Sequence, residues 1–481
     1  MTGPRDQVDD ALGQALEHLT IAHHRRRLRR VGWEAAMEPR PGPWADGDPP
    51  ARQGNMLEVL IDGAEAFARL AEDIRQARSY VHLTGWHIMP DFALTRDDTP
   101  VILRDLLAER AHQIPVRVLI WAGAPVPLLR PWRGDVRKVK ARLETTNRIQ
   151  VALDQRERPM HCHHEKTIVI DDRVAYVGGI DLTSFNGDRW DTTRHQARSS
   201  VGWHDVATRI AGPAVADVAA NFALRWQAVT AQEVIAGPPS EPVGNVELQV
   251  VRTMPDGMYP RHPQGDFRIL QSYLRGLSSA KHLIYIENQF LWSPEILGVL
   301  REKLRNPPSP DFRLLVVLPA KPNSGGDDTR GQLGTLLQAD GENNRVLACT
   351  LVSTGGSVQD LPIYVHAKVA IVDDQWMTIG SANLNEHSLF NDTEMNVVTH
   401  DAPLITKTRH RLWAEHLERP IAEMTGNPTE LIDKSWRPIA QEQAERVARQ
   451  ERQTHRLTLL PGVSRRSGLL RGPLQGLVVD A

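Results

Sequence analysis

Short apolar runs alternate along this chain with longer segments whose apolar residues follow a helical period. The runs are four to seven residues long, and several are rich in β-branched residues, which predicts buried strands. They are Leu57–Ile61, Tyr80–Thr84, Val116–Trp121, Thr167–Ile170, Leu283–Ile286, Phe312–Leu318 and Val369–Val372. Helices are predicted over 64–77, 102–111, 267–277, 294–304 and around 411–417. The alternation predicts layered α/β domains in which helices flank a sheet.

The series of strands and helices occurs twice. The first series ends near a break at Gly237-Pro238-Pro239, after which the same plan is repeated. We therefore predict two similar layered α/β domains, at residues 51–238 and 239–420.

The first 50 residues precede these domains. A helix is predicted from Val8 to about Val31, and it ends in the basic run His23–Arg30. Its apolar positions at helical spacing are Ala11, Leu12, Ala15, Leu16, Leu19 and Ala22. Such a helix either lies at an anionic membrane surface or docks on the body with a solvated basic end, and we favour docking. Residues 39–50 are rich in Pro and Gly and are predicted to be a linker.

Residues 421–481 follow the second domain. The segment 441–456 has a polar helical pattern. The apolar residues beyond it are Leu457, Leu459, Leu460, Leu469, Leu470, Leu477, Val478 and Val479. This apolar content predicts that the tail docks on the body of the protein.

Composition restricts the function classes. The chain has 481 residues and a net charge of −2, which gives no global attraction to nucleic acid. Its two cysteines, Cys162 and Cys349, indicate a reducing compartment, and we expect a cytoplasmic protein. The N-terminus lacks a signal-peptide pattern, and no apolar run is long enough to span a bilayer. A lipid substrate would therefore be reached from the water side, at the membrane surface.

Two strands carry the candidate chemistry. His164, Lys166 and Asp171 form a His-x-Lys-x4-Asp motif around the strand 167–170, and Gly178-Gly179 follows after six residues. A motif of three fixed positions occurs by chance on the order of once in ten thousand positions. Its return in the second domain therefore indicates a duplicated protein with one composite site.

The second copy is formed by His366, Lys368 and Asp373, with Gly380-Ser381 after six residues. In both copies the His and Lys are two residues apart, so both side chains lie on one face of the strand. An imidazole beside an ammonium group can bind an anion and attack or protonate it.

The sequence around both motifs resembles the phospholipase D superfamily, most closely the plant and animal phospholipases D. The similar segments are His163–Lys166, Gly178–Leu182, Arg189–Asp191, Trp203–Val206, Tyr285–Phe290 and Gly380–Asn385. The resemblance covers roughly residues 54–417. It implies two domains that face each other around a pseudo-twofold axis, with the active site between them. Nothing in the sequence resembles the calcium-binding module that precedes the catalytic part of the plant enzymes.

The resemblance also implies a mechanism. One neutral imidazole attacks phosphorus and the other, protonated, donates to the leaving oxygen, through a phosphohistidine that water or an alcohol resolves. The two motifs are symmetric, so the spacing does not say which histidine attacks; the resemblance assigns His164 as nucleophile and His366 as general acid. By motif position, Glu394 orients His164 and Asp205 orients His366. No step requires a metal or a cofactor.

Substrate binding is assigned in the same way. Lys166 and Lys368 offset the charge of the phosphodiester. Asn383 matches a residue that binds phosphoryl oxygens, whereas its counterpart Asp181 is a poorer phosphate ligand unless it is protonated or bridged. Asp171 and Asp373 are expected to support the fold.

Two local features complicate the assignment. Related enzymes usually carry an Arg at the position of His387, so the substitution puts a local salt bridge in doubt. The run from His161 to His164 could be a metal cluster. Consecutive strand residues point to opposite faces, however, so all four cannot bind one ion and we expect no metal there.

Four functions compete. The first is a phospholipase D that hydrolyses glycerophospholipids or exchanges their head groups. The second is a cardiolipin-synthase-like phosphatidyltransferase, which we rank lower because no transmembrane segments are evident. The third, a nucleic-acid phosphodiesterase, is disfavoured by the near-neutral charge balance. The fourth, a non-catalytic membrane-binding or scaffold protein, is disfavoured by the two intact His-Lys pairs.

Overall fold

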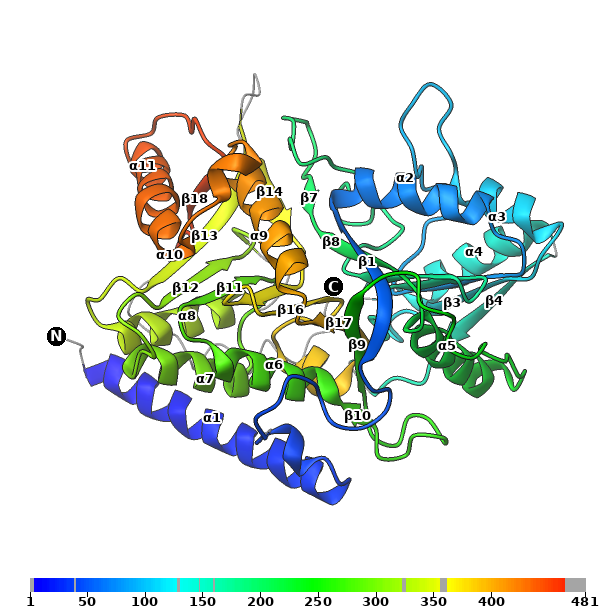
Figure 1. The fold of residues 1–481 in the computed structure, drawn as a ribbon, viewed down its shortest axis with the longest axis horizontal. Helices are drawn as coiled ribbons and strands as arrows, with labels where there is room; N and C mark the ends of the chain where they lie inside the picture. Colours follow the sequence, from blue (N-terminus) through cyan, green and yellow to red (C-terminus); the bar gives the residue numbers. More distant parts are fainter. Residues whose placement is uncertain are drawn as a thin grey trace.

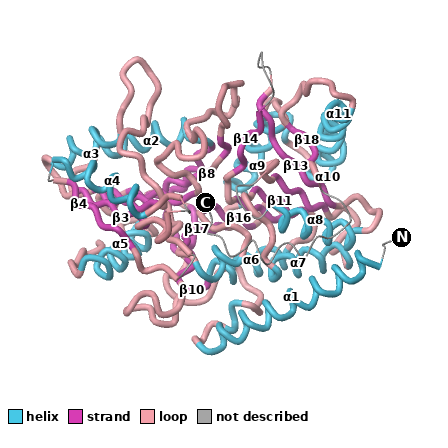
Figure 2. Tube along the Cα trace, turned by 180° about the vertical axis from the view of Figure 1, so that it is seen from behind, coloured by secondary structure: helices cyan, strands magenta, loops and turns pink. Residues whose placement is uncertain are grey.

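The structure is a computed structural model that describes residues 4–38, 40–127, 130–146, 148–158, 161–321, 326–354 and 361–462. Two halves lie side by side, each built around a sheet with helices packed on it (Figure 1). Seen from behind, the strands of both sheets run through the middle of the molecule with helices outside them (Figure 2). This arrangement confirms the predicted fold class.

The first sheet has the strand order β1-β8-β6-β5-β2-β3-β4. Its strands are β1 (Arg52–Ile61), β2 (Val81–Gly85), β3 (Val116–Trp121), β4 (Ile149–Asp154), β5 (Thr167–Ile170), β6 (Val174–Gly178) and β8 (Val206–Ala211). The β2-β3 and β3-β4 pairs are parallel, and the other pairs are antiparallel.

The second sheet repeats this topology, with the order β9-β17-β16-β15-β11-β12-β13 and parallel pairing at the same two places. Its strands are β9 (Val246–Met254), β11 (Leu283–Glu287), β12 (Arg313–Val317), β13 (Val346–Ser353), β15 (Val369–Val372), β16 (Trp376–Gly380) and β17 (Glu394–Thr399). Strands β1 and β9 also pair with each other and join the two sheets. The internal repeat in the sequence is therefore a repeat of topology. The exact domain boundaries stay predictions.

Helices cover both faces of each sheet. In the first half α2, α3 and α4 pack on one face and α5 on the other. In the second half α6, α7 and α8 pack on one face, and α9 and α11 on the other. The bounds are α2 (Asp62–Arg75), α3 (Leu103–Ala111), α4 (Arg133–Leu143), α5 (Val215–Thr230), α6 (Arg268–Ser279), α7 (Pro294–Arg305), α8 (Gly326–Asp340), α9 (Ala402–His416), α10 (Pro428–Leu431) and α11 (Arg437–Ala448).

The N-terminal helix α1 (Pro4–Arg30) lies along α7 at the outer edge of the second half (Figure 1). It docks through charged side chains, because Glu17 pairs with Arg301 and His24 Nδ1 contacts Glu295 Oε1 at 2.8 Å. Arg27 is buried as well and donates to Asp256 Oδ1 at 2.8 Å.

The helix docks, as favoured from the sequence, but its apolar positions at helical spacing do not form the docked face. Leu16 and Leu19 are exposed, as are Ala15 and Ala22. The side chains of Ala11 and Leu12 lie outside the described residues. The apolar periodicity does not reveal the docked face, because long polar side chains make its contacts. Glu17, His24 and Arg27 each have a specific partner in α7 or in a loop beside it.

The remaining terminal segments pack on the body. The 39–50 linker is anchored where the Ala45 N–H donates to Gln249 Oε1 at 2.9 Å. Helix α11 ends at Ala448, so the helix predicted to continue to residue 456 is wrong at its C-terminal end. Strand β18 (Leu457–Leu459) then pairs with β13, which holds this part of the tail on the second sheet. The apolar residues from Leu469 to Val479 lie outside the described residues. Within the described part of the chain, no helix has both the length and the apolar character needed to cross a bilayer.

Candidate active site

Both motif strands are central in their sheets. Strand β5 pairs with β2 and β6, and β15 pairs with β11 and β16, in the same register in each half. Every residue of both strands is buried. Burial on both faces selects the apolar, β-branched residues in these strands, and it rigidly positions the His and Lys that precede them.

The aspartates of the motifs lie at the other end of these strands, away from the histidines. Asp171 accepts hydrogen bonds from the backbone N–H groups of residues 78–80, at 2.7–2.9 Å. Asp373 accepts from the N–H groups of residues 281–283, at 2.6–2.9 Å. Each carboxylate thus fastens the segment that leads into the neighbouring strand, which agrees with the supporting role predicted for both residues.

The two histidines face each other across the seam between the halves. The ring centroids of His164 and His366 are 6.5 Å apart, and the two residues are 5% and 4% exposed. A tetrahedral phosphorus centre fits between two imidazoles at this separation. The geometry therefore brings together the groups that the sequence assigned to one composite site.

Each imidazole contacts a carboxylate from the opposite half. His164 Nδ1 lies 2.9 Å from Glu394 Oε1, and His366 Nδ1 lies 2.6 Å from Asp205 Oδ2. Because Nδ1 is engaged in both rings, Nε2 is the nitrogen that can do chemistry. The backbone repeats the crossing, since His164 N–H donates to Thr393 O and His366 N–H donates to His204 O.

The two lysines are buried beside the histidines. Lys166 Nζ lies 2.8 Å from His164 O and 3.2 Å from Asp181 Oδ2. Lys368 Nζ lies 2.6 Å from His366 O and 3.2 Å from Gln289 Oε1. Asp181 is therefore bridged to a cation, the condition under which we expected it to remain near a phosphate.

Two neighbouring amide side chains, those of Asn383 and Gln289, lie at the site, and both come from the second half. Asn383 Nδ2 lies 3.4 Å from Gln289 Oε1, so the predicted phosphate ligand is next to a side chain that was not predicted. Gln289 lines the same small pocket as His164 and His366. Its motif segment, Tyr285–Phe290, was noted from the sequence, but no role was assigned to the amide.

Arg189 adds a cationic side chain to the lining of this pocket. Its guanidinium lies 3.8 Å from the ring centroid of Trp203, and the Trp203 ring in turn packs at a tilt against His366, with centroids 4.6 Å apart. Nη1 donates to the carbonyl of Thr183 at 3.2 Å. Burial lowers the pKa of Arg189 to about 10, although Asp181 and Asp205 act in the opposite direction. The side chain stays charged at neutral pH and adds to the positive potential of the pocket.

Burial and this positive potential together set the protonation of the groups at the site. Burial, followed by Lys368 and Lys166, lowers the pKa of His366 well below its usual value. Burial also raises the pKa of Asp205 to about 6 and the pKa of Glu394 well above its usual range. The free site thus favours a neutral imidazole at His366, and a bound phosphodiester anion favours its protonation.

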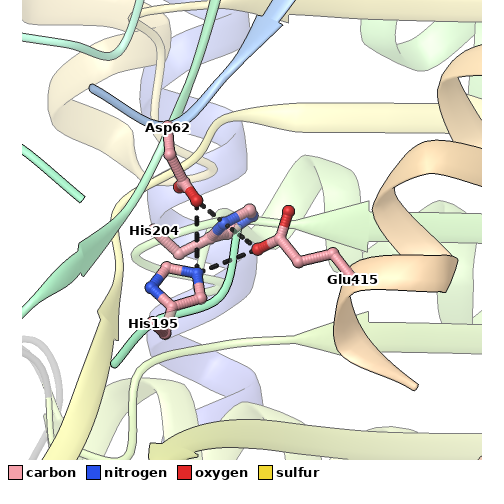
Figure 3. A group of neighbouring side chains, drawn as sticks. All are labelled: Asp62, His195, His204 and Glu415. Carbon is pink, nitrogen blue, oxygen red and sulfur yellow. Dashed lines mark hydrogen bonds and ion pairs between the residues drawn. The ribbon is translucent and has the colours of Figure 1, made fainter. Parts of the chain in front are cut away.

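A second polar centre lies behind Asp205. Figure 3 shows Asp62, His195, His204 and Glu415 turned toward one another, from four separate segments. Glu415 Oε1 lies 2.9 Å from His195 Nε2 and 3.0 Å from His204 Nδ1. Asp62 Oδ1 lies 3.0 Å from His204 Nδ1 and accepts from the Asp205 N–H at 3.2 Å. This centre therefore holds the backbone of Asp205, whose carboxylate contacts His366.

The same four residues could hold a divalent cation. All four are buried, and their donor atoms lie within 4.8 Å of one another. Protonated histidines can also balance the charge of the two carboxylates. Burial opposes the charged form of His195, but the surrounding carboxylates outweigh it and raise the pKa of His195 to about 9. Sequence reasoning missed this centre. Each of the four segments contributes only a single His or acidic residue to the centre. The segments are far apart in the chain, so nothing in the sequence indicates that these residues meet.

Comparison with known proteins agrees with this geometry. The sequence family described as "Phospholipase D" matches residues 73–202, and the family described as "Cardiolipin synthase, PLD-like domain" matches residues 273–415. Phospholipase D A of Dictyostelium discoideum is 25% identical over 466 residues, covering 76% of this chain and 36% of that protein. The major cardiolipin synthase of Bacillus subtilis is 24% identical over 394 residues, covering 77% of this chain and 73% of that protein.

A solved structure has the same fold. The phosphatidylserine synthase of Haemophilus influenzae superposes with a TM-score of 0.51 at 13% identity, covering 82% of this chain and 92% of that one. The chain spans about a third of the length of the Dictyostelium relative and nearly three quarters of the Bacillus relative. The first of these family matches includes His164 and the second includes His366, so each half of the chain has its own match.

Proposed function

This chain belongs to the phospholipase D superfamily, and we propose that it cleaves glycerophospholipids at the head-group side of the phosphodiester. The products are phosphatidic acid and the free head group, or a phosphatidyl-alcohol when an alcohol replaces water. The observation that carries the proposal is the pair of buried imidazoles 6.5 Å apart, each beside a lysine and each held by a carboxylate from the other half.

The first chemical step forms a phosphohistidine. His164 Nε2 attacks phosphorus while the bond from phosphorus to the head-group oxygen breaks. His366, protonated in the presence of the anionic substrate, donates its proton to that oxygen. Lys166, Lys368 and the amide of Asn383 stabilise the charge that develops on the phosphoryl oxygens.

The second step resolves the intermediate. His366, now neutral, takes a proton from water or an alcohol, and the resulting oxygen nucleophile attacks phosphorus. The bond to His164 breaks and the phosphatidyl product leaves. An alcohol bound in the pocket has the advantage of proximity over bulk water, so transfer competes with hydrolysis.

A second candidate is a phosphatidyltransferase that uses a lipid hydroxyl as acceptor. It is supported by the match of residues 273–415 to the cardiolipin-synthase family and by the Bacillus relative. Both candidates share the first step and differ only in the group that resolves the intermediate.

One assay tests both candidates. Purified protein is incubated with vesicles of phosphatidylcholine, phosphatidylethanolamine and phosphatidylglycerol, with and without a primary alcohol, and the lipids are identified by mass spectrometry. Phosphatidic acid that is diverted into phosphatidyl-alcohol supports the hydrolase. Cardiolipin formed from phosphatidylglycerol, with little phosphatidic acid, supports the transferase. No lipid product under any condition contradicts both.

We further propose that the protein meets the membrane surface from the water side through α1. The helix exposes Leu16 and Leu19, and Arg25 and Arg26 follow on the exposed surface. Each basic residue near an anionic surface contributes about 1 kcal/mol. Replacing Arg25, Arg26 and Arg29 with Gln, while keeping the buried Arg27, should weaken binding to anionic vesicles and leave neutral vesicles unaffected. Equal binding by variant and parent contradicts this role.

A further inference from the structure

Three metal-ligand side chains meet on the seam beside the first motif. His161 Nδ1 lies 3.0 Å from His387 Nδ1 and 3.5 Å from Asp392 Oδ1. The three donor atoms all lie within 4.8 Å of one another. Both His161 and His387 were noted in the sequence, one in a histidine-rich run and the other where an Arg was expected, but no role joined them.

A single helical turn brings two of the ligands together. His387 is the first residue of η3, a π-helical turn (His387–Asn391), and Asp392 follows its last residue; the Asp392 N–H donates to His387 O at 2.8 Å. π-Helical turns are rare in proteins, and those that do occur are often found at functional sites. His161 reaches the same point from the first half, because the Cys162 N–H donates to Asp392 Oδ1 at 2.8 Å.

The spacing fits a tetrahedral transition ion. Bonds of about 2.0–2.1 Å to imidazole nitrogen and carboxylate oxygen place neighbouring donor atoms roughly 3.3 Å apart in a tetrahedron. The two measured separations, 3.0 and 3.5 Å, lie on either side of this value. The three side chains are therefore close enough to share one tetrahedral ion, with a fourth position for water.

An independent observation points to a cation at this place. Asp392 is 1% exposed, and its Oδ2 has no hydrogen-bond donor among the described residues. A buried carboxylate oxygen without a donor or a cation is costly. An Arg at position 387 would offer several donors to this carboxylate, whereas the imidazole of His387 offers at most one at each nitrogen.

We propose that His161, His387 and Asp392 bind a divalent transition ion of the zinc class. Two imidazoles and one carboxylate are ligands that such ions prefer, whereas magnesium and calcium prefer oxygen alone. The side chain of His161 is 18% exposed, which gives the ion a route from solvent while the other two ligands are buried. The site lies next to the catalytic pair, and the proposed chemistry of His164 and His366 does not pass through the ion.

The ion would act as a clamp between the halves. Asp392 precedes Thr393 and Glu394, which contact His163 and His164 respectively. A metal that joins His161 to Asp392 fastens the segment that carries the nucleophile to the segment that carries its orienting carboxylate. Binding to the folded state alone also raises the unfolding temperature, by an amount that grows with the logarithm of the metal concentration relative to Kd.

The experiment uses the full chain, freed of metal with a chelator, and measures zinc stoichiometry by calorimetry and cobalt binding by visible absorption. His387→Arg removes one ligand and supplies the donors that relatives have there. His161→Gln removes another ligand by a different route. His282→Arg is the matched control, because His282 Nδ1 contacts Asp311 at 3.0 Å on the exposed surface and is in no group of three possible ligands among the described residues.

The expected result is one zinc equivalent fewer in His387→Arg and in His161→Gln than in wild type and His282→Arg. Counting equivalents separates this site from the cluster around Asp62, which both variants leave intact. Zinc should raise the unfolding midpoint of wild type and of His282→Arg by more than it raises that of the two ligand variants. The same stoichiometry in all four proteins, or no zinc bound by any of them, overturns the proposal.

Discussion

In the first half of the molecule, Lys166 contacts the carboxylate of Asp181 at 3.2 Å, whereas in the second half Lys368 contacts the amide oxygen of Gln289 at the same distance. The strand order of the two halves is identical, so the difference lies in side chains alone. A carboxylate accepts hydrogen bonds only, but an amide also donates them. We therefore predict that the amides of Gln289 and Asn383 donate to phosphoryl oxygens, a contact that the carboxylate of Asp181 cannot make.

The orienting carboxylates differ in a related way. Glu394, which contacts His164, also accepts hydrogen bonds from the hydroxyls of Ser381 and Ser388. Asp205, which contacts His366, accepts from its neighbour's backbone at Val206 and lies against Gly179, the counterpart of Ser381. The shorter acid fits closely only because the residue opposite has no side chain. The duplicated fold thus holds two equivalent imidazoles by different local means.

The largest expected effect comes from removing either imidazole. His164→Ala and His366→Ala should each lower kcat by about four orders of magnitude or more, and the double variant should be little worse than either single one, because the groups act as a unit. Steady-state kinetics on a soluble phosphodiester measures this. A His366→Ala enzyme with near-normal turnover would mean that each half works alone.

The next effect tests the two carboxylates. Asp205→Asn and Glu394→Gln keep the size of the side chain but can present an amide N–H to Nδ1, which favours the wrong tautomer. We expect kcat to fall by roughly two to four orders of magnitude in each, with KM changed much less. Unchanged kcat in either variant would show that the imidazole it contacts does not depend on that carboxylate.

A smaller effect separates Gly179 from Ser381. A Cβ at Gly179 would lie 2.2 Å from Asp205 Oδ1, so Gly179→Ala should displace this carboxylate and destabilise the fold by about 1–3 kcal/mol. Ser381→Ala, the matched control, removes one hydrogen bond to Glu394 and should cost about 1 kcal/mol. Denaturant unfolding and kcat of both variants check the order. If Ser381→Ala is the more damaging, the close fit at Gly179 is not what positions Asp205.

The smallest effect is a shift in pH dependence. His366 must be protonated to act as the acid, and in the free site burial and the two lysines lower its pKa. Since kcat/KM reports the free enzyme and kcat the complex, the alkaline limb of kcat should lie at higher pH than that of kcat/KM. Profiles measured on a lipid-like soluble substrate give both limbs. Coincident limbs would show that the substrate does not raise the pKa of His366.

The sequence predicted the elements that carry the site better than the contacts between them. Strands β3, β5 and β15 were placed with their observed ends, because central buried strands are short apolar runs with distinct boundaries. The histidines and lysines of the two motifs do lie together with Asp205 and Glu394, although their roles stay predictions.

What the sequence missed depends on three-dimensional convergence. Gln289, Arg189 and the cluster around Asp62 have neighbours far away in the chain, and no periodic pattern marks such meetings. The sequence also did not reveal that the apolar positions of α1 face outward. The reason is related, because Glu17 and His24 dock the helix through individual partners. A periodic apolar pattern in the sequence indicates burial against a common core. These contacts are instead single polar pairs, which leave no periodic pattern.

The most direct test of the account is to identify the residue that carries the covalent intermediate. Lipid labelled in the phosphatidyl group is mixed with enzyme, quenched rapidly under conditions that preserve phosphohistidine, and the label is located by peptide mass spectrometry. We predict label on His164, formed as the head group is released, and its accumulation in a His366→Ala variant given a substrate with a good leaving group. Label on His366 would reverse the two roles, and inversion at phosphorus with no labelled protein would contradict the covalent mechanism.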